Sequence, residues 1–549
     1  METPIGEKPA TKFTVPMGRV ISFATLVAAG SVLGQASGLV RELVVSAQFG
    51  LSAEIDAYVI AIQVPTGINN IVAGSAIAAA VMPTFALYLA TGERKEFWYV
   101  ASIITNLVLL VAGVLTVLGM LLAGPIISVF GMGLPAPGRS LAAAMLVIMM
   151  PTLALGALLN MLMAALNSLD RFVGRALIFT ALNGGIIVTV LLLAPMLGIY
   201  SVAIGFTIGV LLQVLVQFFE LRIEKVQYSF KLDLHHPALR QVGAVFLPIT
   251  LLAVFSQINL AVDPAMAAHL PTGSVGALQK ATTVLGAFYA LGISLGIAVF
   301  PTLSRLAATN DLESTARAIT MSLRLLIFVL APLTLLLIAF ANPVVGALLG
   351  RGLFDAKAVE MTAAALTMYA IGLIAFAILN VLQPAFYALS DGRTPLVIGT
   401  LMVVVHVALN VLLIPTMAHA GIALSASLTT ILGVVILIVL LSRRVPGIAL
   451  AGLAVFLLRC AIFAAVSTAF VVWLFLSLHL GVETLVGRIA GVAMVGLGGL
   501  AYFVLAMLTR TPECEMLLRT ARGLLRLDGR RSTAKRDGGP RSETEDGSK

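Results

Sequence analysis

Long apolar runs recur along almost the whole chain, and they limit the possible folds more than any other feature. We count fourteen apolar segments, at residues 20–45, 55–90, 98–131, 140–168, 174–197, 199–221, 240–266, 274–306, 318–341, 358–389, 395–415, 420–442, 449–479 and 484–509. About 20 residues of helix cross the ~30 Å hydrocarbon core of a membrane. The shorter segments of alternating polarity that a membrane β-barrel needs are absent. The sequence therefore predicts an all-α polytopic membrane protein with about fourteen transmembrane helices.

Composition supports this class and argues against several others. Apolar residues make up 60% of the chain, charged residues 11%, and the mean hydropathy is +1.07. Residues 1–18 are polar and lead into a long first segment, so we expect no cleavable signal peptide. The two cysteines, Cys460 and Cys514, do not suggest a disulfide framework. No phosphate-binding loop, zinc-ligand spacing or nucleophile elbow is present, which favours a transporter over an enzyme, with no cofactor.

Two stretches of the chain recur about 220 residues later. The segment from Gly74 to Thr91 matches the segment from Gly292 to Thr309 at an offset of 218, with Gly, Ala, Val, Pro, Thr, Ala and Thr in register. A second match, Ala157 to Leu162 against Ala377 to Leu382, falls at an offset of 220. Such a duplication is typical of transporters built from two halves around a central cavity.

The distribution of Lys and Arg predicts the orientation. With the N-terminus inside, most basic residues fall in cytoplasmic connections. Those that fall elsewhere, of 34 in total, are Arg41, Arg139, Lys280, Arg351, Lys357, Arg459 and Arg488. The net charge of +9 is therefore explained by topology and not by nucleic-acid binding. Both termini are expected inside, which requires an even number of helices.

The repeat and the topology together give a domain layout. We expect a cytoplasmic N-terminus at 1–19, an N-lobe of six helices at 20–222 and a C-lobe of six helices at 223–443. Two additional helices at 449–509 and a basic, disordered cytoplasmic tail at 510–549 complete it. Six helices per repeat would give both pseudo-symmetric lobes the same orientation in the membrane.

Several motifs resemble the MurJ/MviN family. They begin with Gly34-Gln-Ala-Ser-Gly38-Leu-Val-Arg41-Glu42, Phe49-Gly50 and Asp56-Ala57-Tyr58, and continue with Ser256-Gln257-Ile258 and Arg171-Phe172. The most specific are Arg351-Gly352-Leu-Phe354 and Phe386-Tyr387-Ala388…Asp391-Gly-Arg393-Thr394-Pro395. Members of this family flip lipid II, the undecaprenyl-linked peptidoglycan precursor, across the bacterial cytoplasmic membrane. The resemblance covers residues 18–510 and implies the fold of the wider superfamily of MATE-like exporters.

The resemblance also implies a cargo site, where this chain departs from the family. In the family, arginines of segments one, two and eight are thought to bind the diphosphate, as a planar guanidinium can. Arg41 stands at one of these positions, whereas Gln35, Asn69, Asn70 and Thr282 replace the others, and Lys280 lies nearby. These six residues are the candidate cargo ligands. Neutral amides in such helices also serve as contacts between helices.

A second set of polar residues suggests a site for a coupling ion. Asp263 precedes a proline in an apolar segment, and His406 and Asn410 share a helix face at i, i+4 spacing. The resemblance implies a sodium site from an Asp on segment seven, polar residues on segment eleven and a hydroxyl on segment twelve, here Ser425 or Ser427. Sodium at Asp263 and Asn410 is one interpretation; His406 favours proton coupling, since imidazole titrates near neutral pH. Interhelical hydrogen bonding is the simpler alternative.

Four further charged residues are candidates for gating or structural roles. Glu42 follows Arg41, and Asp56 lies at the start of segment two, where it could begin a helix. Asp391 and Arg393 belong to the motif between segments ten and eleven.

The function predicted is an alternating-access flippase for an undecaprenyl-diphosphate-linked sugar, with lipid II first, in the inner membrane. Membrane lipids and proteins of cell-wall synthesis or division are the expected partners. One alternative is a flippase for another lipid-linked oligosaccharide, of exopolysaccharide or O-antigen, or a MATE-like drug antiporter. Another is a transport-inactive scaffold for cell-wall proteins. Tolerance of substitutions at Arg41, Asp263 and His406 would favour the scaffold.

Overall fold

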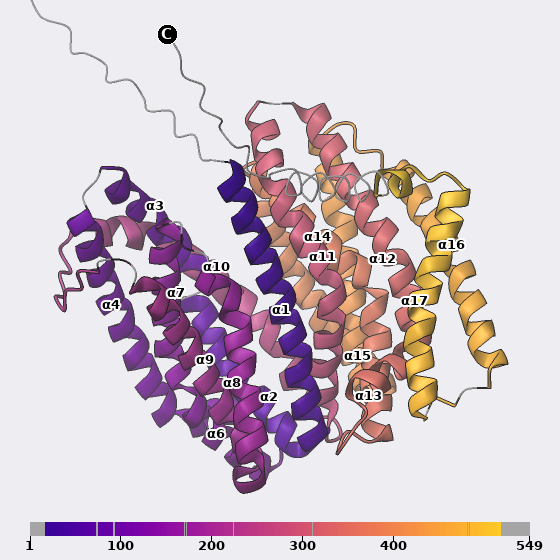
Figure 1. Ribbon diagram of the computed structural model, residues 1–549, viewed down its shortest axis with the longest axis horizontal. Helices are drawn as coiled ribbons and strands as arrows, with labels where there is room; N and C mark the ends of the chain where they lie inside the picture. The colour runs from indigo at the N-terminus through magenta and orange to yellow at the C-terminus, as the bar shows by residue number, and fades with distance from the viewer. Residues whose placement is uncertain are drawn as a thin grey trace, which may run out of the picture. The chain divides into compact units, whose positions relative to one another are not determined.

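Every regular element in the described part of the chain is a helix, which confirms the predicted all-α class (Figure 1). The computed structural model describes residues 17–72, 75–91, 94–169, 171, 173–222, 224, 226–309, 311–479, 481–482 and 484–517. Most of the predicted N-terminal segment and of the predicted basic tail lies outside these residues.

The helices follow one another with short connections. In the first part of the chain they are α1 (Met17–Phe49), α2 (Ala53–Val72), α3 (Ser75–Ala90), α4 (Arg94–Leu121), α5 (Ala123–Phe130), α6 (Ala136–Met149), α7 (Pro151–Ser168), α8 (Val173–Leu197), α9 (Tyr200–Leu221) and α10 (Pro237–Ala267). The rest are α11 (Ser274–Ala308), α12 (Leu312–Leu349), α13 (Ala356–Ile371), α14 (Leu373–Ala388), α15 (Arg393–Arg444), α16 (Leu450–Ser477) and α17 (Leu485–Leu508).

Each predicted apolar segment falls on one of these helices or on two consecutive ones. Among the described residues, eight helical stretches are long and apolar enough to cross a membrane, and α13 with α14, bent by 48°, makes a ninth. The chain is therefore a multi-span membrane protein. The count of fourteen spans stays a prediction.

Helix α15 is interrupted near its middle. It runs for 52 residues, about 78 Å at 1.5 Å per residue, far more than the ~30 Å of a hydrocarbon core. Ala418 has a left-handed φ of 49°, and a Cβ at Gly421 would lie 2.7 Å from the Leu413 carbonyl oxygen. Residues eight apart are about 12 Å apart along a straight helix, so the chain turns sharply here. The predicted segments 395–415 and 420–442 lie on either side of this turn.

The chain divides into two compact units. Unit 1 comprises Met1–Ala287, Leu348–Ala365 and Val407–Ala423; unit 2 comprises Phe288–Ala347, Leu366–His406 and Leu424–Lys549. The boundaries of the predicted lobes stay a prediction, because they rest on the repeat and not on these units.

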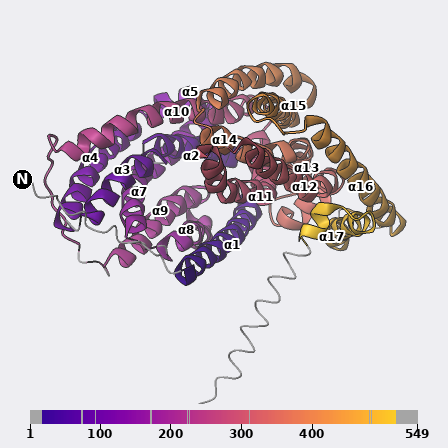
Figure 2. The same cartoon turned by 90° about the horizontal axis from the view of Figure 1, so that it is seen from above.

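Unit 1 is built on pairs of closely packed helices. Helix α8 packs against α1 and α9, as both views show, and α10 packs against α2 and α3 (Figures 1 and 2). A Cβ at Gly185 of α8 would lie 2.6 Å from the Cα of Gly209 in α9. Small residues let helix backbones approach in this way, which favours association inside a membrane.

Unit 2 holds the end of the described chain in place. The Arg324 guanidinium of α12 lies 4.4 Å from the centre of the Phe456 ring in α16. Its Nε is 2.7 Å from Glu513 Oε1, just beyond α17. Thr511 and Cys514 beside this carboxylate are buried. The segment after α17 is therefore part of the packed unit.

The matched parts of the repeat also agree in local geometry. Asn160 Nδ2 donates to the Gly156 carbonyl at 2.8 Å, and Asn380 Nδ2 donates to the Phe376 carbonyl at 2.8 Å. The N–H of Arg171 bonds the Leu166 carbonyl at 2.9 Å, as the N–H of Asp391 bonds that of Phe386 at 2.9 Å. Both helices thus end in the same hydrogen-bonded turn.

Candidate cargo and gating site

Three charged side chains of unit 1 meet where α1 passes α11. Arg41 Nη2 donates to Glu42 Oε1 at 2.5 Å, and Lys280 Nζ of α11 donates to Glu42 Oε2 at 2.7 Å. Glu42 therefore accepts one charge-assisted hydrogen bond on each oxygen. With two cations and one anion, this trio carries a net charge of +1.

The two cations differ in how much of them solvent can reach. The Lys280 side chain is 5% exposed, whereas the Arg41 side chain is 27% exposed. Arg41 Nη1 also donates to Asn183 Oδ1 of α8 at 3.2 Å. Asn183 in turn donates to the Ser37 hydroxyl at 3.0 Å, so α8 fixes the direction of the guanidinium. Of the two, Arg41 is the cation that can meet a ligand in this state.

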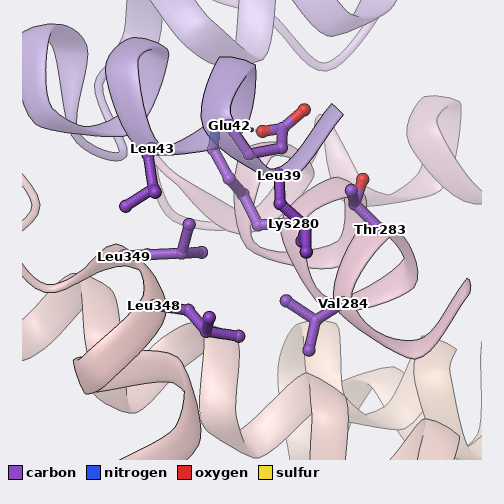
Figure 3. A pocket seen from close by; sticks show the side chains of 8 residues that line it. All are labelled: Leu39, Glu42, Leu43, Lys280, Thr283, Val284, Leu348 and Leu349. Atoms are coloured by element: carbon purple, nitrogen blue, oxygen red, sulfur yellow. Dashed lines mark hydrogen bonds and ion pairs between the residues drawn. The ribbon is translucent and has the colours of Figure 1, made fainter. Parts of the chain in front are cut away.

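A small pocket beside Glu42 and Lys280 is too narrow for cargo. Its lining residues, drawn in Figure 3, are Leu39, Glu42, Leu43, Lys280, Thr283, Val284, Leu348 and Leu349. Its volume is about 10 Å³, room for about one water molecule. Apart from Glu42, Lys280 and Thr283, aliphatic side chains surround it. These side chains close the space around the ion pair.

Asp56 connects the start of α2 to the start of α11. Its Oδ2 accepts the Gly273 N–H at 2.6 Å, and its Oδ1 accepts the Gly276 N–H at 2.8 Å. A carboxylate at a helix N-terminus satisfies otherwise unpaired N–H groups and interacts favourably with the helix dipole. Asp56 thus caps α11 and not its own helix α2.

The Arg351-Gly352-Leu-Phe354 motif lies against the end of α1. The Leu353 N–H donates to the Ala47 carbonyl at 2.9 Å, and Phe354 is buried. Gly352 has a left-handed φ of 61°, and a Cβ there would lie 2.2 Å from the Ala47 carbonyl oxygen. Only glycine fits this close approach. We refer to the Glu42–Lys280, Ala47–Leu353 and Asp56–Gly273 contacts together as the α1–α2 latch.

The other predicted cargo residues, Gln35, Asn69, Asn70 and Thr282, also belong to unit 1. Gln35 and Asn70 are exposed, and the Thr282 hydroxyl donates to the Gln279 carbonyl of its own helix at 2.9 Å. Asn69 packs on Gly156, where a Cβ would lie 2.2 Å from its Nδ2, and its Oδ1 is buried without a hydrogen-bond partner.

Part of the predicted ion site comes together. Asn410 is fully buried and donates to Asp263 Oδ1 at 3.2 Å, with Met266 Sδ at 3.5 Å. In this arrangement the amide N–H₂, not its oxygen, faces the carboxylate. Asn410 thus offers Asp263 a donor and no oxygen, so the pair does not by itself form a cage of oxygen ligands for a cation.

The remaining members of that predicted site are buried residues of unit 2. They are His406, Ser425 and Ser427. The Ser427 hydroxyl donates to the Met368 carbonyl at 2.7 Å, which gives it a structural contact within that unit.

Asp391 lies in the connection between α14 and α15. It forms an ion pair with Arg444, the last residue of α15. Asp391 Oδ1 also accepts the N–H groups of Arg393 at 3.1 Å and Thr394 at 3.0 Å. The Thr394 hydroxyl also bonds Asp391. This bond, the two backbone bonds and the nearby Arg444 guanidinium hold the pKa of Asp391 below its usual range. Asp391 therefore caps α15, and Arg393 contributes its backbone.

Asn183 is a site residue that the sequence analysis missed. Its signal was a single amide in the apolar run 174–197, since polar side chains inside a span usually have a named partner. No motif linked it to Arg41, 142 positions earlier.

Comparisons with known proteins agree with this fold. The family model described as "Lipid II flippase MurJ" matches residues 45–490. The lipid II flippase MurJ of Burkholderia cenocepacia is 28% identical over 423 residues, 75% of this chain and 82% of that protein. A probable lipid II flippase MurJ of Synechocystis is 26% identical over 520 residues, 90% of this chain and 96% of that protein.

Solved structures match at the level of the fold. A lipid II flippase MurJ in an inward closed conformation superposes with a TM-score of 0.73 at 23% identity, covering 88% of this chain and 99% of that one. An inward-facing MATE family transporter gives a TM-score of 0.63 at 14% identity, covering 77% and 98%. Because the family model spans well over half of the sequence, the chain belongs to the lipid II flippase MurJ family.

Proposed function

We propose that this chain translocates lipid II across the bacterial inner membrane by alternating access, as a step of peptidoglycan biosynthesis. The observation that carries the proposal is the family match over residues 45–490. No bond is made or broken in such transport, so the chain has to bind a head group and change its access from one face to the other.

The cargo site of the proposal centres on Arg41. A lipid diphosphate carries about two negative charges, and the trio of Arg41, Glu42 and Lys280 supplies a net charge of +1. Gln35 and Asn70 are exposed neutral donors, and neutral hydrogen bonds are roughly half as strong as charge-assisted ones. We therefore expect weaker recognition of the diphosphate than in a cavity with several arginines, and more reliance on the sugar and the lipid tail.

The α1–α2 latch supplies the gating part of the proposal. Its three contacts join α1 and α2 to α11 and to the segment before α13. With both termini inside, as the positive-inside rule favours, the latch lies towards the outer face. Release of cargo outside would then require Lys280 to leave Glu42 and Asp56 to leave the start of α11.

Depletion of the protein in its host tests the proposal. Lipid II is then measured on each membrane face, by its access to a reagent that does not cross the membrane. We expect lipid II to accumulate on the inner face and to redistribute when the wild-type chain is restored. Unchanged distribution on depletion, with no second flippase in the host, would contradict the function.

A flippase for another lipid-linked oligosaccharide is the second candidate. Neutral residues at four of the family's arginine positions favour it. Native mass spectrometry of the purified protein with lipid II and with undecaprenyl-diphosphate oligosaccharides separates the two. Preferential retention of an oligosaccharide without the peptide would support this candidate over the first.

We further propose that an ion gradient drives the cycle through Asp263, Asn410 and His406. The hydrogen bond between Asp263 and Asn410 supports a role for this pair. Protons and sodium are both compatible with a carboxylate and an imidazole among these side chains. Transport in vesicles with an imposed proton gradient or sodium gradient tells them apart.

A further inference from the structure

Residues 226–236 of the connection between α9 and α10 form no helix and run alongside α4 (Figure 1). Here the alternate residues are all apolar and all exposed, namely Val226, Tyr228, Phe230, Leu232 and Leu234. Phe230 is 91% exposed, and its ring meets that of Tyr228 edge to face at 4.9 Å. We call these five side chains the apolar edge.

The two ends of this connection are held at the start of α4. Glu224 bonds Arg94 at 2.7 Å and Arg171 at 3.1 Å. At the other end, Tyr99 donates to Asp233 at 3.4 Å and His236 meets Glu96 at 3.2 Å. Both ends are thus polar and lie near the same turns of α4.

The middle of the connection reaches much farther along α4. Asn106 Nδ2 donates to the carbonyls of Ser229 and Lys231, each at 2.8 Å. The Ser229 N–H donates to the Ser102 hydroxyl at 3.1 Å, and the Tyr228 hydroxyl donates to Asn106 Oδ1. Asn106 lies ten residues beyond Glu96, about 15 Å at 1.5 Å per residue. The connection therefore dips along α4 and returns, with Phe230 near the deepest point.

Helix α4 spans the membrane, so the dip beside it is surrounded by lipid and not by water. An 18-residue window within Arg94–Leu121 has a mean hydropathy of 2.4. Beyond Asn106, the exposed side chains of α4 are apolar, among them Leu110, Val111 and Val114. The apolar edge continues this lipid-facing surface towards the start of the helix.

The polar contacts of the dip fit a lipid environment. Irregular backbone is tolerated at membrane depth only where its N–H and C=O groups find partners in the protein. Asn106 and Ser102 supply such partners where the dip is deepest. The exposed Lys231 side chain can extend its ammonium group back to the head-group layer along its aliphatic stem. Tyr228 has the amphipathic ring that is common at membrane interfaces.

From this geometry we infer that residues 226–236 form a re-entrant loop whose apolar edge contacts the acyl chains of the leaflet into which α4 begins. The loop anchors the connection between the two predicted lobes to lipid. This inference does not depend on which lipid-linked sugar the protein carries.

Fluorescence quenching in vesicles of the purified full-length protein tests the loop. The added tryptophan of Phe230→Trp is compared with that of His235→Trp, an exposed position near the polar end. Emission of the wild-type Trp98 and Trp473 is subtracted. We expect Phe230→Trp to be blue-shifted and quenched by phosphatidylcholine brominated on its acyl chains. His235→Trp should instead be quenched by acrylamide in the water.

A second variant tests the contacts that hold the loop. Asn106→Leu, combined with Phe230→Trp, leaves two backbone carbonyls without a donor, so quenching should move from brominated lipid to acrylamide. Thr105→Val is the matched control, because the Thr105 hydroxyl bonds the Ala101 carbonyl of its own helix, at 2.7 Å. It should leave the pattern of Phe230→Trp unchanged.

Two results would overturn the inference, and a third would remove Asn106 as the residue that holds the loop. The first is strong acrylamide quenching of Phe230→Trp in vesicles that hold only this protein. The second is acrylamide access in vesicles together with protection in native membranes, which would assign the apolar edge to a protein partner. The third is unaltered lipid quenching in Asn106→Leu, which would mean that the contacts with α4 do not hold the loop in the bilayer.

Discussion

Glu42 is the residue on which two cations converge, and this limits what each cation can do. Lys280 is buried and engaged, whereas Arg41 keeps one side of its guanidinium open while Asn183 fixes its direction. A planar guanidinium presents a fixed fork of donors to phosphate, which an ammonium group does not. Recognition of an anionic head group is therefore expected to depend on one side chain.

The first prediction follows at this scale. Arg41→Ala should abolish or strongly weaken retention of lipid II by the purified protein, and Arg41→Lys should restore it only in part. Native mass spectrometry measures this. Arg317→Ala is the control, because the exposed Arg317 pairs only loosely with Glu313 at 3.7 Å. If Arg41→Ala retains lipid II as well as the wild type does, the diphosphate does not bind at this site.

The second prediction concerns restoration of the missing charges. Gln35→Arg combined with Thr282→Arg adds two guanidinium groups at positions where the family carries arginine. If the head group lies near Arg41, lipid II should bind more tightly, and its retention should become more sensitive to salt. The matched control is Gln35→Lys with Thr282→Lys, which adds the same charge without the planar fork.

The third prediction concerns Lys280. Lys280→Met removes one of the two cationic partners of the buried Glu42 carboxylate. Leaving a buried charge with no partner typically costs about 3–5 kcal/mol, and the cost here should be smaller because Arg41 stays paired. The double variant Lys280→Met with Glu42→Gln should recover part of this loss, since the carboxylate that has lost Lys280 is gone and the partly exposed Arg41 still bonds Asn183. Thermal unfolding in detergent, analysed as a double-mutant cycle, measures the coupling. Additive effects of the two changes would mean that the ion pair contributes nothing to stability.

At the scale of elements, Asp56 makes the start of α11 dependent on the start of α2. Loss of a helix-capping side chain typically costs about 1 kcal/mol. Asp56→Ala should therefore lower the unfolding temperature, and Asp56→Asn, which keeps one acceptor, should lower it less. Glu54→Ala, on the same turn but exposed, is the control. Equal effects at both positions would argue against the cap.

The connection before α15 should show its own pH dependence. The pKa of Asp391 is lowered in the folded protein, mainly by hydrogen bonds from Thr394 and further by Arg444. A carboxyl group with a lowered folded pKa stabilises the protein above its unfolded pKa of ~4, and this contribution is lost as the pH falls below it. Unfolding of Asp391→Asn should then depend less on pH between about 3 and 5 than that of wild type. Identical slopes would exclude Asp391 as a source of that dependence.

The elements were largely predictable because their signal is local. Apolar runs of 20 or more residues form helices in a membrane whatever their neighbours, and each predicted run falls on helix. Breaks were predicted only in part. The gap between segments 395–415 and 420–442 places a connection at Ala418 but does not specify its left-handed φ, and the single segment 358–389 gives no sign of the bend at Gly372 between α13 and α14.

The candidate site was predicted only in part, because its contacts join residues far apart in the sequence. Arg41, Glu42 and Lys280 were each singled out, but not their convergence, since Lys280 lies 238 positions after Glu42. Asp56 was expected to start a helix, yet it caps α11 through Gly273, which lies 217 positions later. The sequence shows that a side chain is charged and in which segment it lies. Its partner depends on how the helices pack.

For the whole molecule, orientation in the membrane is the property that most needs a direct test. Single cysteines at positions 95, 235 and 530 should react with an impermeant maleimide only from the cytoplasmic side. A cysteine at 272 should react only from outside. The buried Cys460 and Cys514 are replaced by alanine beforehand. Reaction of position 235 from outside would overturn the predicted topology.

The sharp turn at Ala418 has a consequence for how this protein is made. Only residues 416–419 separate the two predicted apolar segments within α15. The turn between them brings Gly421 close to Leu413. So short a connection has few polar residues that could stay outside the membrane while the first span enters it. We expect the two halves of α15 to partition into the bilayer together as one hairpin, so that a reporter fused between them would disturb the membrane insertion of both.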